Sequence, residues 1–292
     1  MSTSDAVTRG PGDPCWRALV DDAALFPPGD APLPAAVAAH RRHRAAWYAP
    51  VVGPFVVADH RLDELAAALD ADPFPCVLVV CGTVPDALAR ADRAGVPVAA
   101  VEVAVSGDDL VAAVDAVAGS LGSAADRPVL AVELPALDPD AAWLAACDRL
   151  VAIGARLKLR TGGVRAEAFP PTDRLARWLV AADERGLPVK CTAGLHAAVR
   201  HTDPATGFEH HGFLDVLAAV GALLDGAAEA DVRDLLDRRD AAGLAATVAG
   251  WDVGTRGRVR ERFTGFGSCS TTGPLDDLCA LGLLEPPAGA RP

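Results

Sequence analysis

The chain has 292 residues, is 51% hydrophobic and carries a formal net charge of −12. This charge disfavours nucleic acid as a partner, and no apolar run reaches the roughly 20 residues that a membrane-spanning helix needs. The first residues lack the basic and apolar regions of a signal peptide. We therefore expect a cytoplasmic protein that acts on a small molecule, without a membrane or nucleic-acid partner.

The two ends are polar and rich in Gly and Pro, and we expect flexible tails over residues 1–14 and 286–292. Residues 15–285 then form a single domain. Seven cysteines are scattered along the chain without a C-x-x-C pair. This pattern predicts reduced, mostly buried thiols and signals neither a zinc site nor a redox motif of that kind.

Short apolar segments alternate with segments of helical spacing along most of the chain. The expected strands lie near residues 18–22, 51–57, 76–81, 97–104, 129–134, 155–160, 187–192 and 262–267. The first of these is also compatible with a helix. Strands that are apolar on both faces and alternate with amphipathic helices indicate a parallel sheet covered by helices.

The rhythm changes after residue 196, where a polar loop precedes helical segments near 213–224 and 229–248. We expect no strand in residues 197–261. Eight strand-then-helix units predict a (β/α)8 TIM barrel with a helical insertion between strands seven and eight. An open doubly wound sheet is the alternative, although no Gly-rich dinucleotide loop follows an early strand.

Lys158 and Lys190 are the only lysines in the chain, and each lies near the end of an expected strand and precedes Thr and Gly. A buried Lys can lose its proton near neutral pH, whereas Arg cannot. Two neighbouring ammonium groups disfavour each other's protonation, and burial acts in the same direction. We therefore predict one neutral amine that forms a Schiff base with a carbonyl; two incidental lysines are the alternative.

Three short motifs at these strand ends resemble the deoxyribose-phosphate aldolases and related class I aldolases. Lys158-Leu-Arg-Thr-Gly162 is similar to the K-x-x-T-G of that family, and Lys190-Cys-Thr-Ala-Gly194 to its K-x-[ST]-x-G. Gly267-Ser-Cys-Ser270 is similar to its G-[TA]-S-[SA]. The resemblance implies a cofactor-independent lyase that makes or breaks a C–C bond next to the carbonyl of a small polar or anionic substrate.

The same resemblance implies roles for individual residues. Lys158 forms the Schiff base, Lys190 tunes it, and Asp21 and Glu102 shuttle protons. Ionised acids are seldom buried without a partner, so Glu102 and Glu133, each on an apolar strand, are natural partners of the lysines. The expected substrate-binding residues are Glu133, Arg160, Thr161, Thr192, His196 and Ser268. A purely structural network of ion pairs is the alternative for the charged residues.

A second enzyme hypothesis is a lyase or hydrolase on the same barrel that depends on a divalent metal. Histidines gather in the loop after the seventh strand, and with the two buried acids they offer the ligand types that such an ion takes. The alternative ligand set is Glu102, Glu133, His196, His210 and His211. No H-x-H or H-E-x-x-H pattern supports it.

Two further alternatives remain. Cys191 and Cys269 lie beside the motifs, and a nucleophilic role for either would need a histidine within reach. A barrel can also survive without catalysis, as a small-molecule-binding protein. The apolar helical insertion suits a lid over the pocket or a homo-oligomer interface.

Overall fold

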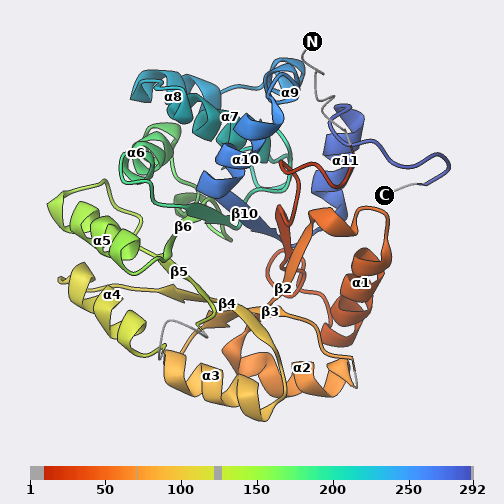
Figure 1. Ribbon diagram of the computed structural model, residues 1–292, viewed down its shortest axis with the longest axis vertical. Coiled ribbons are helices and arrows are strands. Elements are labelled where there is room, and N and C mark those ends of the chain that lie inside the picture. Colours follow the sequence, from red (N-terminus) through yellow and green to blue (C-terminus); the bar gives the residue numbers. More distant parts are fainter. Residues whose placement is uncertain (1–9, 71, 122–126, 291–292) are drawn as a thin grey trace.

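The computed structural model describes residues 10–70, 72–121 and 127–290. Within these residues eight strands close into an all-parallel barrel in the order β1-β10-β7-β6-β5-β4-β3-β2 (Figure 1). The eight expected strands and the predicted TIM barrel are thus confirmed. The barrel strands are β1 (Val20–Asp22), β2 (Val52–Ala58), β3 (Cys76–Val80), β4 (Val98–Ala104), β5 (Val129–Glu133), β6 (Arg156–Arg160), β7 (Val189–Thr192) and β10 (Phe263–Ser268).

Helices cover the outside of the barrel, as the alternating pattern predicts (Figure 1). Those that follow successive barrel strands are α1 (Leu33–Ala45), α2 (Leu62–Leu69), α3 (Val84–Arg93), α4 (Leu110–Gly119), α5 (Ala141–Ala152), α6 (Thr172–Asp183), α7 (Phe213–Leu224) and α11 (Thr272–Ala280). Short 3-10 turns lie at η1 (Ala49–Val51), η2 (Asp59–Arg61) and η4 (Ala166–Ala168).

Side-chain caps fix the points where two of these helices begin. Asp109 accepts a hydrogen bond from the amide of Ala112 at 2.9 Å, and Asp140 accepts one from Trp143 at 2.8 Å. Each satisfies an amide that the first turn leaves free and contributes about 1 kcal/mol. Because α4 and α5 follow strands, the caps hold loops at the carboxyl end of the barrel, where a TIM barrel builds its site.

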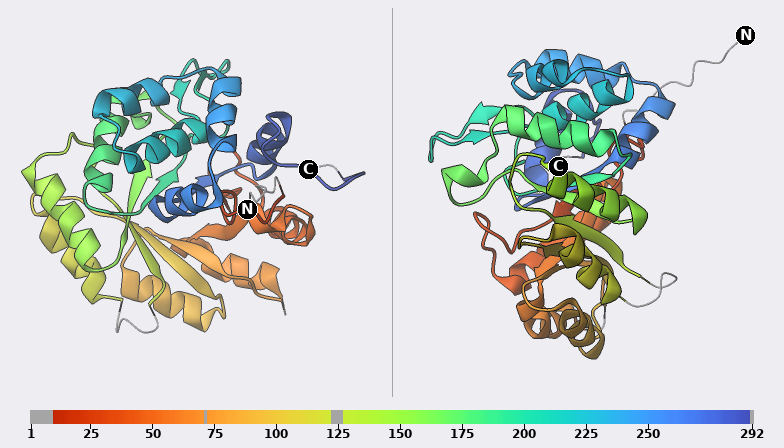
Figure 2. Two further views of the ribbon diagram at one scale, coloured as in Figure 1. Left: turned by 45° about the horizontal axis from the view of Figure 1, so that its top comes forward. Right: turned by 90° about the vertical axis from the view of Figure 1, so that its left-hand side faces the viewer.

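The expected helical insertion needs two corrections. Phe213–Leu224 is the ordinary seventh helix of the barrel: α7 is almost wholly buried, and Phe213 stacks on Phe266 of β10 with ring centroids 5.3 Å apart. The additional helices are α8 (Glu229–Leu236), α9 (Ala241–Ala249) and α10 (Val253–Arg262), which pack beside α7 (Figure 2).

The second correction concerns strands. The loop between β7 and α7 contains a small antiparallel pair, β8 (His201–Thr202) and β9 (Glu209–His210), where we expected none. Two residues per strand are too short to show a period in sequence. The pair holds the loop in a defined shape above the end of β7.

One residue of the expected amino-terminal tail is buried. Residues 1–9 lie outside the described residues, but Asp13 is 1% exposed and its carboxylate binds Arg256 of α10 at 2.7 Å. Residues 291–292 of the expected carboxyl-terminal tail are also outside the described range. None of the helices in the described residues has the length and apolar character that crossing a membrane would require.

Candidate active site

Two lysines and two carboxylates meet inside the barrel. Lys158 Nζ of β6 lies 2.8 Å from Glu102 Oε2 of β4, and Lys190 Nζ of β7 lies 2.5 Å from Asp21 Oδ2 of β1. Lys190 also binds Glu102 Oε1, so this one carboxylate bridges both amines. β4 and β7 are not neighbours in the barrel, which means that these contacts cross its interior.

Strand register explains why the charged side chains converge. Glu133, Lys158 and Lys190 are direct Cα partners on β5, β6 and β7. Side chains alternate between the two faces of a strand, so residues paired in this way face the same side. Lys158 Nζ accordingly lies 3.3 Å from Glu133 Oε2 as well. The prediction that Lys158 and Lys190 lie together on neighbouring strands is confirmed.

The electrostatics of the cluster differ from the sequence-based expectation. Burial alone would lower the pKa of Lys190, but the carboxylates of Asp21 and Glu102 outweigh it and raise the pKa above the ordinary lysine value. Lys190 is therefore not the one neutral amine that we expected of the pair, and its carboxylate neighbours, rather than repulsion between the amines, set its pKa. That expectation weighed burial and the second lysine, and gave no weight to the carboxylates of Asp21 and Glu102 in contact with this amine.

Glu102 shows the reciprocal effect. Burial alone would raise its pKa, but Lys190 and Lys158 together lower it to about 2. Glu102 therefore remains a carboxylate across the whole physiological range. It is 2% exposed, so its charge is balanced by the two amines and hardly by water.

Asp21 is the carboxylate that holds a proton more readily. Burial, with a smaller effect of the Glu102 charge, raises its pKa above the ordinary aspartate value, although Lys190 acts in the opposite direction. The side chain fits against β2 because residue 53 is glycine: a Cβ there would lie 1.9 Å from Asp21 Oδ1. The neighbouring acid Asp22 faces the other way and binds His40 of α1 at 2.9 Å, so only Asp21 joins the lysines.

A cavity of about 240 Å³ opens above this cluster. Lys158 and Glu102 lie in its wall, whereas Lys190 and Asp21 do not. Much of the remaining wall is apolar, which limits the water around the amine. The full lining is Ala23, Phe26, Pro27, Val56, Val79, Glu102, Lys158, Arg160, Gly163, Val164, Thr192, Ala193, His196, Gly267 and Cys269.

Three of the expected substrate-binding residues, Arg160, Thr192 and His196, line this cavity. Arg160 is 42% exposed and binds Glu133 through Nε at 2.6 Å. Glu133 does not line the cavity; it orients Arg160 and also contacts Lys158. Arg160 is thus presented at the mouth of the pocket by a fixed carboxylate.

Thr161 and Ser268, which we expected to bind substrate, have hydroxyls that donate to backbone carbonyl oxygens instead. The Thr161 hydroxyl donates to the carbonyl oxygen of Ala193 at 2.5 Å, which ties the end of β6 to the turn after β7. The Ser268 hydroxyl donates to the carbonyl oxygen of Ser270 at 2.8 Å. Both hydroxyls donate to backbone oxygens, because Thr and Ser at strand ends readily bond to nearby backbone. Neither residue lines the cavity.

The turn after β7 carries backbone strain. Ala193 has φ +59° and Gly194 has φ +79°, the left-handed region that costs a residue with a Cβ about 1 kcal/mol. Strain of this kind persists where surrounding contacts enforce it. Here the Thr161 hydroxyl holds the Ala193 carbonyl, and His210 Nδ1 lies 3.2 Å from the Gly194 carbonyl. The turn brings His196 to the cavity.

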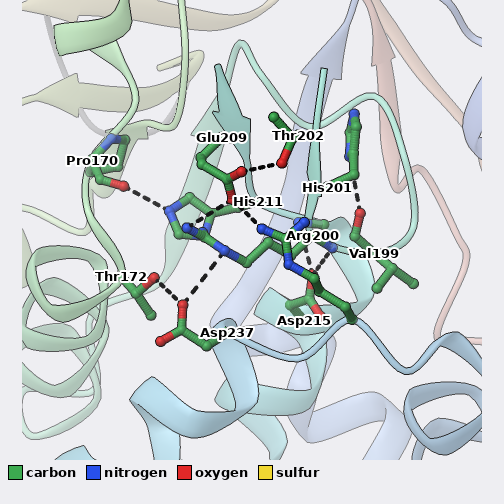
Figure 3. A network of polar contacts seen from close by, with 12 residues as sticks. Pro170, Thr172, Val199, Arg200, His201, Thr202, Glu209, His211, Asp215 and Asp237 are labelled. Atoms are coloured by element: carbon green, nitrogen blue, oxygen red, sulfur yellow. Dashed lines mark hydrogen bonds and ion pairs between the residues drawn. The ribbon is translucent and has the colours of Figure 1, made fainter. Parts of the chain in front are cut away.

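A second polar network holds the loop between β7 and α7 in place (Figure 3). Arg200 lies at its centre, 3.3 Å from Glu209 and 3.5 Å from Asp237, and its NH1 is 3.2 Å from His211 Nδ1. Burial lowers the pKa of His211 to about 4, so this ring is neutral at physiological pH. The network is structural support and contributes no group to the cavity.

The alternative metal ligands are not brought together. His211 Nε2 lies 2.8 Å from the Pro170 carbonyl, and His210 faces Gly194, while Glu102 and Glu133 bind lysines. Among the described residues, a different set places three potential ligand atoms within 4.8 Å of one another: Asp59, His60 and Cys81.

That set follows β2 and β3 at the carboxyl end of the barrel, and its donor types suit a borderline divalent ion. One Asp59 oxygen, Oδ2, already accepts the amides of Cys81 and Gly82. The sequence offers no ligand-spacing motif for this set, because Asp59 and Cys81 are 22 residues apart and only the pairing of β2 with β3 brings them together.

No protein-family model matches this chain, and no relative is found among curated proteins. The likeness to class I aldolases therefore remains one of short motifs at strand ends. What the site can do must be argued from its geometry.

Proposed function

We propose that the protein is a Schiff-base-forming lyase, similar to the class I aldolases, with Lys158 as the amine that captures a carbonyl substrate. The observation that carries the proposal is the difference between the two lysines. Both bind Glu102, but only Lys158 lies in the cavity wall. A substrate in the cavity meets Lys158, while Lys190 stays behind it as a fixed ammonium group.

The charge balance around Lys158 suits an iminium ion. Glu102 and Glu133 lie 2.8 and 3.3 Å from its Nζ. The lysine nitrogen releases one proton before it adds to the carbonyl, and the hydroxyl of the adduct takes up one proton as it leaves as water, so the nitrogen again carries one positive charge, as the ammonium group does. The carboxylates that stabilise the ammonium form therefore also stabilise the iminium, without rearrangement.

Bond cleavage then follows from the electron demand of the iminium. The bond between the α and β carbons of the captured compound breaks and its electron pair forms an enamine. The β-carbon fragment departs as a carbonyl compound once its hydroxyl has lost a proton. Protonation of the enamine and hydrolysis release the second product. The reverse sequence makes the bond.

Protons must enter and leave at several of these steps. Glu102, with its pKa of about 2, serves mainly as the counter-charge. Asp21, whose pKa burial raises, is better suited to carry a proton. The ion-paired series Lys158, Glu102, Lys190, Asp21 connects it to the reacting nitrogen. Water in the cavity completes the path to the substrate carbon.

The walls indicate the class of substrate. A cavity of about 240 Å³ with many apolar contacts takes a small carbonyl compound, and Arg160 at its mouth suits a carboxylate or another anionic group. We propose a short-chain aldehyde or ketone that carries an anionic or hydroxylated end.

The test is borohydride trapping with a panel of small aldehydes and ketones, read by intact mass. Lys158→Arg and Lys190→Arg form a matched pair, because Arg keeps the charge and cannot form an imine under these conditions. We expect an adduct on the wild-type protein and on Lys190→Arg, and none on Lys158→Arg. An adduct that persists in Lys158→Arg, or none on the wild-type protein, contradicts the proposal. A carbonyl compound that raises the melting temperature without any adduct would favour a binding protein instead.

A further inference from the structure

The cavity contains a second potential nucleophile besides the lysine. Cys269, directly after β10, and His196, after β7, both line it. Cys269 Sγ lies 3.6 Å from His196 Nδ1, within the range of a sulfur hydrogen bond. A histidine beside a thiol is the arrangement that activates cysteine nucleophiles. The Schiff-base proposal uses neither group.

The immediate surroundings identify the thiol as the partner of the imidazole. His196 Nδ1 has two neighbours, Cys269 Sγ at 3.6 Å and Ser268 Oγ at 3.4 Å. The Ser268 hydroxyl donates its hydrogen to the Ser270 carbonyl. Of the two neighbours, only the thiol therefore has a hydrogen that is free to go to Nδ1.

Charges around the pair leave it neutral at rest. Burial lowers the pKa of His196, and the nearby rings of His210 and His201 act in the same direction, while Asp203 opposes them weakly. Burial also raises the pKa of Cys269, and Asp30 adds to this, although the Gly29 amide opposes it. A neutral imidazole next to a neutral thiol is a base ready to take the S–H proton.

We propose that Cys269 and His196 form a second catalytic pair in this cavity, in which the thiol adds to a small carbonyl electrophile such as an aldehyde. The Sγ–C bond forms as the C=O π bond opens. The thiol proton passes to His196 Nδ1 and from there to the carbonyl oxygen, giving a hemithioacetal. The step consumes no oxidant or reductant and reverses by the same path.

This inference does not depend on Lys158. The two nucleophiles face one cavity, so a carbonyl fragment near the end of β10 meets the thiol while one above β6 meets the amine. The pair would hold or release the aldehyde that C–C cleavage sets free. It would act equally on an aldehyde that enters from solution.

Alkylation of the full chain by iodoacetamide, mapped by peptide mass, tests the pair. Cys81 is an internal reference because it is exposed and its pKa is raised by burial and by Asp59. We expect Cys269 to react faster than Cys81 at neutral pH. His196→Gln should slow Cys269 by at least about tenfold, a modest share of what a general base contributes, and leave Cys81 unchanged.

The pH profile separates an activated thiol from one that is merely accessible. Because burial lowers the pKa of His196, its imidazole is the free base at neutral pH and above, and the alkylation rate of Cys269 should be nearly flat from about pH 7 to about pH 8. A thiol that must ionise first, such as Cys81, should react faster as the pH rises. A Cys269 rate that rises in parallel with that of Cys81, or that His196→Gln leaves unchanged, overturns the proposal.

The electrophile class is tested separately from the Schiff base. Acetaldehyde added to Lys158→Arg should slow the alkylation of Cys269 and leave Cys81 unaffected. Equal slowing of both cysteines, or of neither, rules out a carbonyl site at Cys269. Because this variant cannot form the imine, the result stands whether or not Lys158 forms a Schiff base in the wild-type protein.

Discussion

Two buried carboxylates in this molecule have pKa values that are shifted in opposite directions. Glu102, in the barrel interior, contacts two lysines, and its pKa falls to about 2. Asp215, 0% exposed at the start of α7, accepts the amides of Arg200 and Gly212, and burial raises its pKa to about 8. Full counter-charges compensate a buried carboxylate, and backbone dipoles alone do so less well.

The comparison extends to the regions around the two acids. In the barrel every charged group of the cluster has an opposite charge in contact. Asp215 Oδ1, in contrast, has no hydrogen-bond partner among the residues that the structure describes. The Arg200 side chain points instead to Glu209 and Asp237 (Figure 3). We infer that the charges of the barrel cluster compensate one another at a reactive site, whereas the loop network holds the backbone between β7 and α7 in place.

The largest effect is expected from Glu102→Ala, which leaves Lys158 and Lys190 buried without their shared carboxylate. Removing one partner of a buried ion pair costs about 3–5 kcal/mol. Urea unfolding followed by circular dichroism measures the loss, and Glu102→Gln, which keeps the shape, should recover part of it. A loss below about 1 kcal/mol would mean that water already compensates these charges.

Acid should remove the same contribution in the wild-type protein. The folded-state pKa of Glu102 lies near 2 and its ordinary value is 4.5. Its stabilisation is therefore complete above about pH 4.5 and is lost as the pH falls to about 2, an effect of about 3 kcal/mol. Unfolding free energies measured across this range should show a shallower slope for Glu102→Gln, and equal slopes would contradict the lowered pKa.

Asp215 should show the opposite sign. Its folded-state pKa of about 8 exceeds the ordinary 3.8, so the folded state binds more protons and loses stability as the pH rises from about 4 to 8. Asp215→Asn has no charge to bury, and between pH 5 and pH 8 it should gain at least about 1 kcal/mol relative to the wild-type protein. Parallel pH profiles would show that the amides suffice to hold the carboxylate.

The smallest effect is expected on the surface of the loop network. Arg239 is 51% exposed and pairs with Glu209, which is 40% exposed. Exposed pairs contribute between zero and about 1 kcal/mol and weaken with salt. Arg239→Ala should therefore change the unfolding free energy by less than about 1 kcal/mol. A larger loss would place this pair in the same class as the barrel cluster.

The residues of the barrel cluster could be predicted from the sequence because their positions depend on the regular alternation of strands and helices. The order of the eight strands placed Lys158 and Lys190 side by side. The rarity of buried acids without a partner, together with the aldolase resemblance, selected Glu102. The protonation states of these side chains could not be predicted from the sequence. They depend on contacts across the barrel, such as Asp21 with Lys190, for which strand spacing gives no distance.

The loops at the site could be predicted from the sequence only in part. His196 was expected at the cavity, but nothing in the sequence placed it within reach of Cys269. The turn at Ala193, which brings His196 to the cavity, has a left-handed backbone conformation. Sequence predicts this conformation at Gly and rarely at Ala. The β8–β9 pair and the position of Arg200 depend likewise on long-range packing.

The central claim is that Lys158 meets the ligand while Lys190 remains a charged partner, and these are the only two lysines in the chain. Protein labelled with ¹³C at lysine Cε gives two signals, which Lys158→Arg assigns. We predict that a small aldehyde with borohydride moves the Lys158 signal to that of a secondary amine, while the Lys190 signal stays that of an ammonium group to strongly alkaline pH. Movement of the Lys190 signal instead, or no movement of either, would contradict the account.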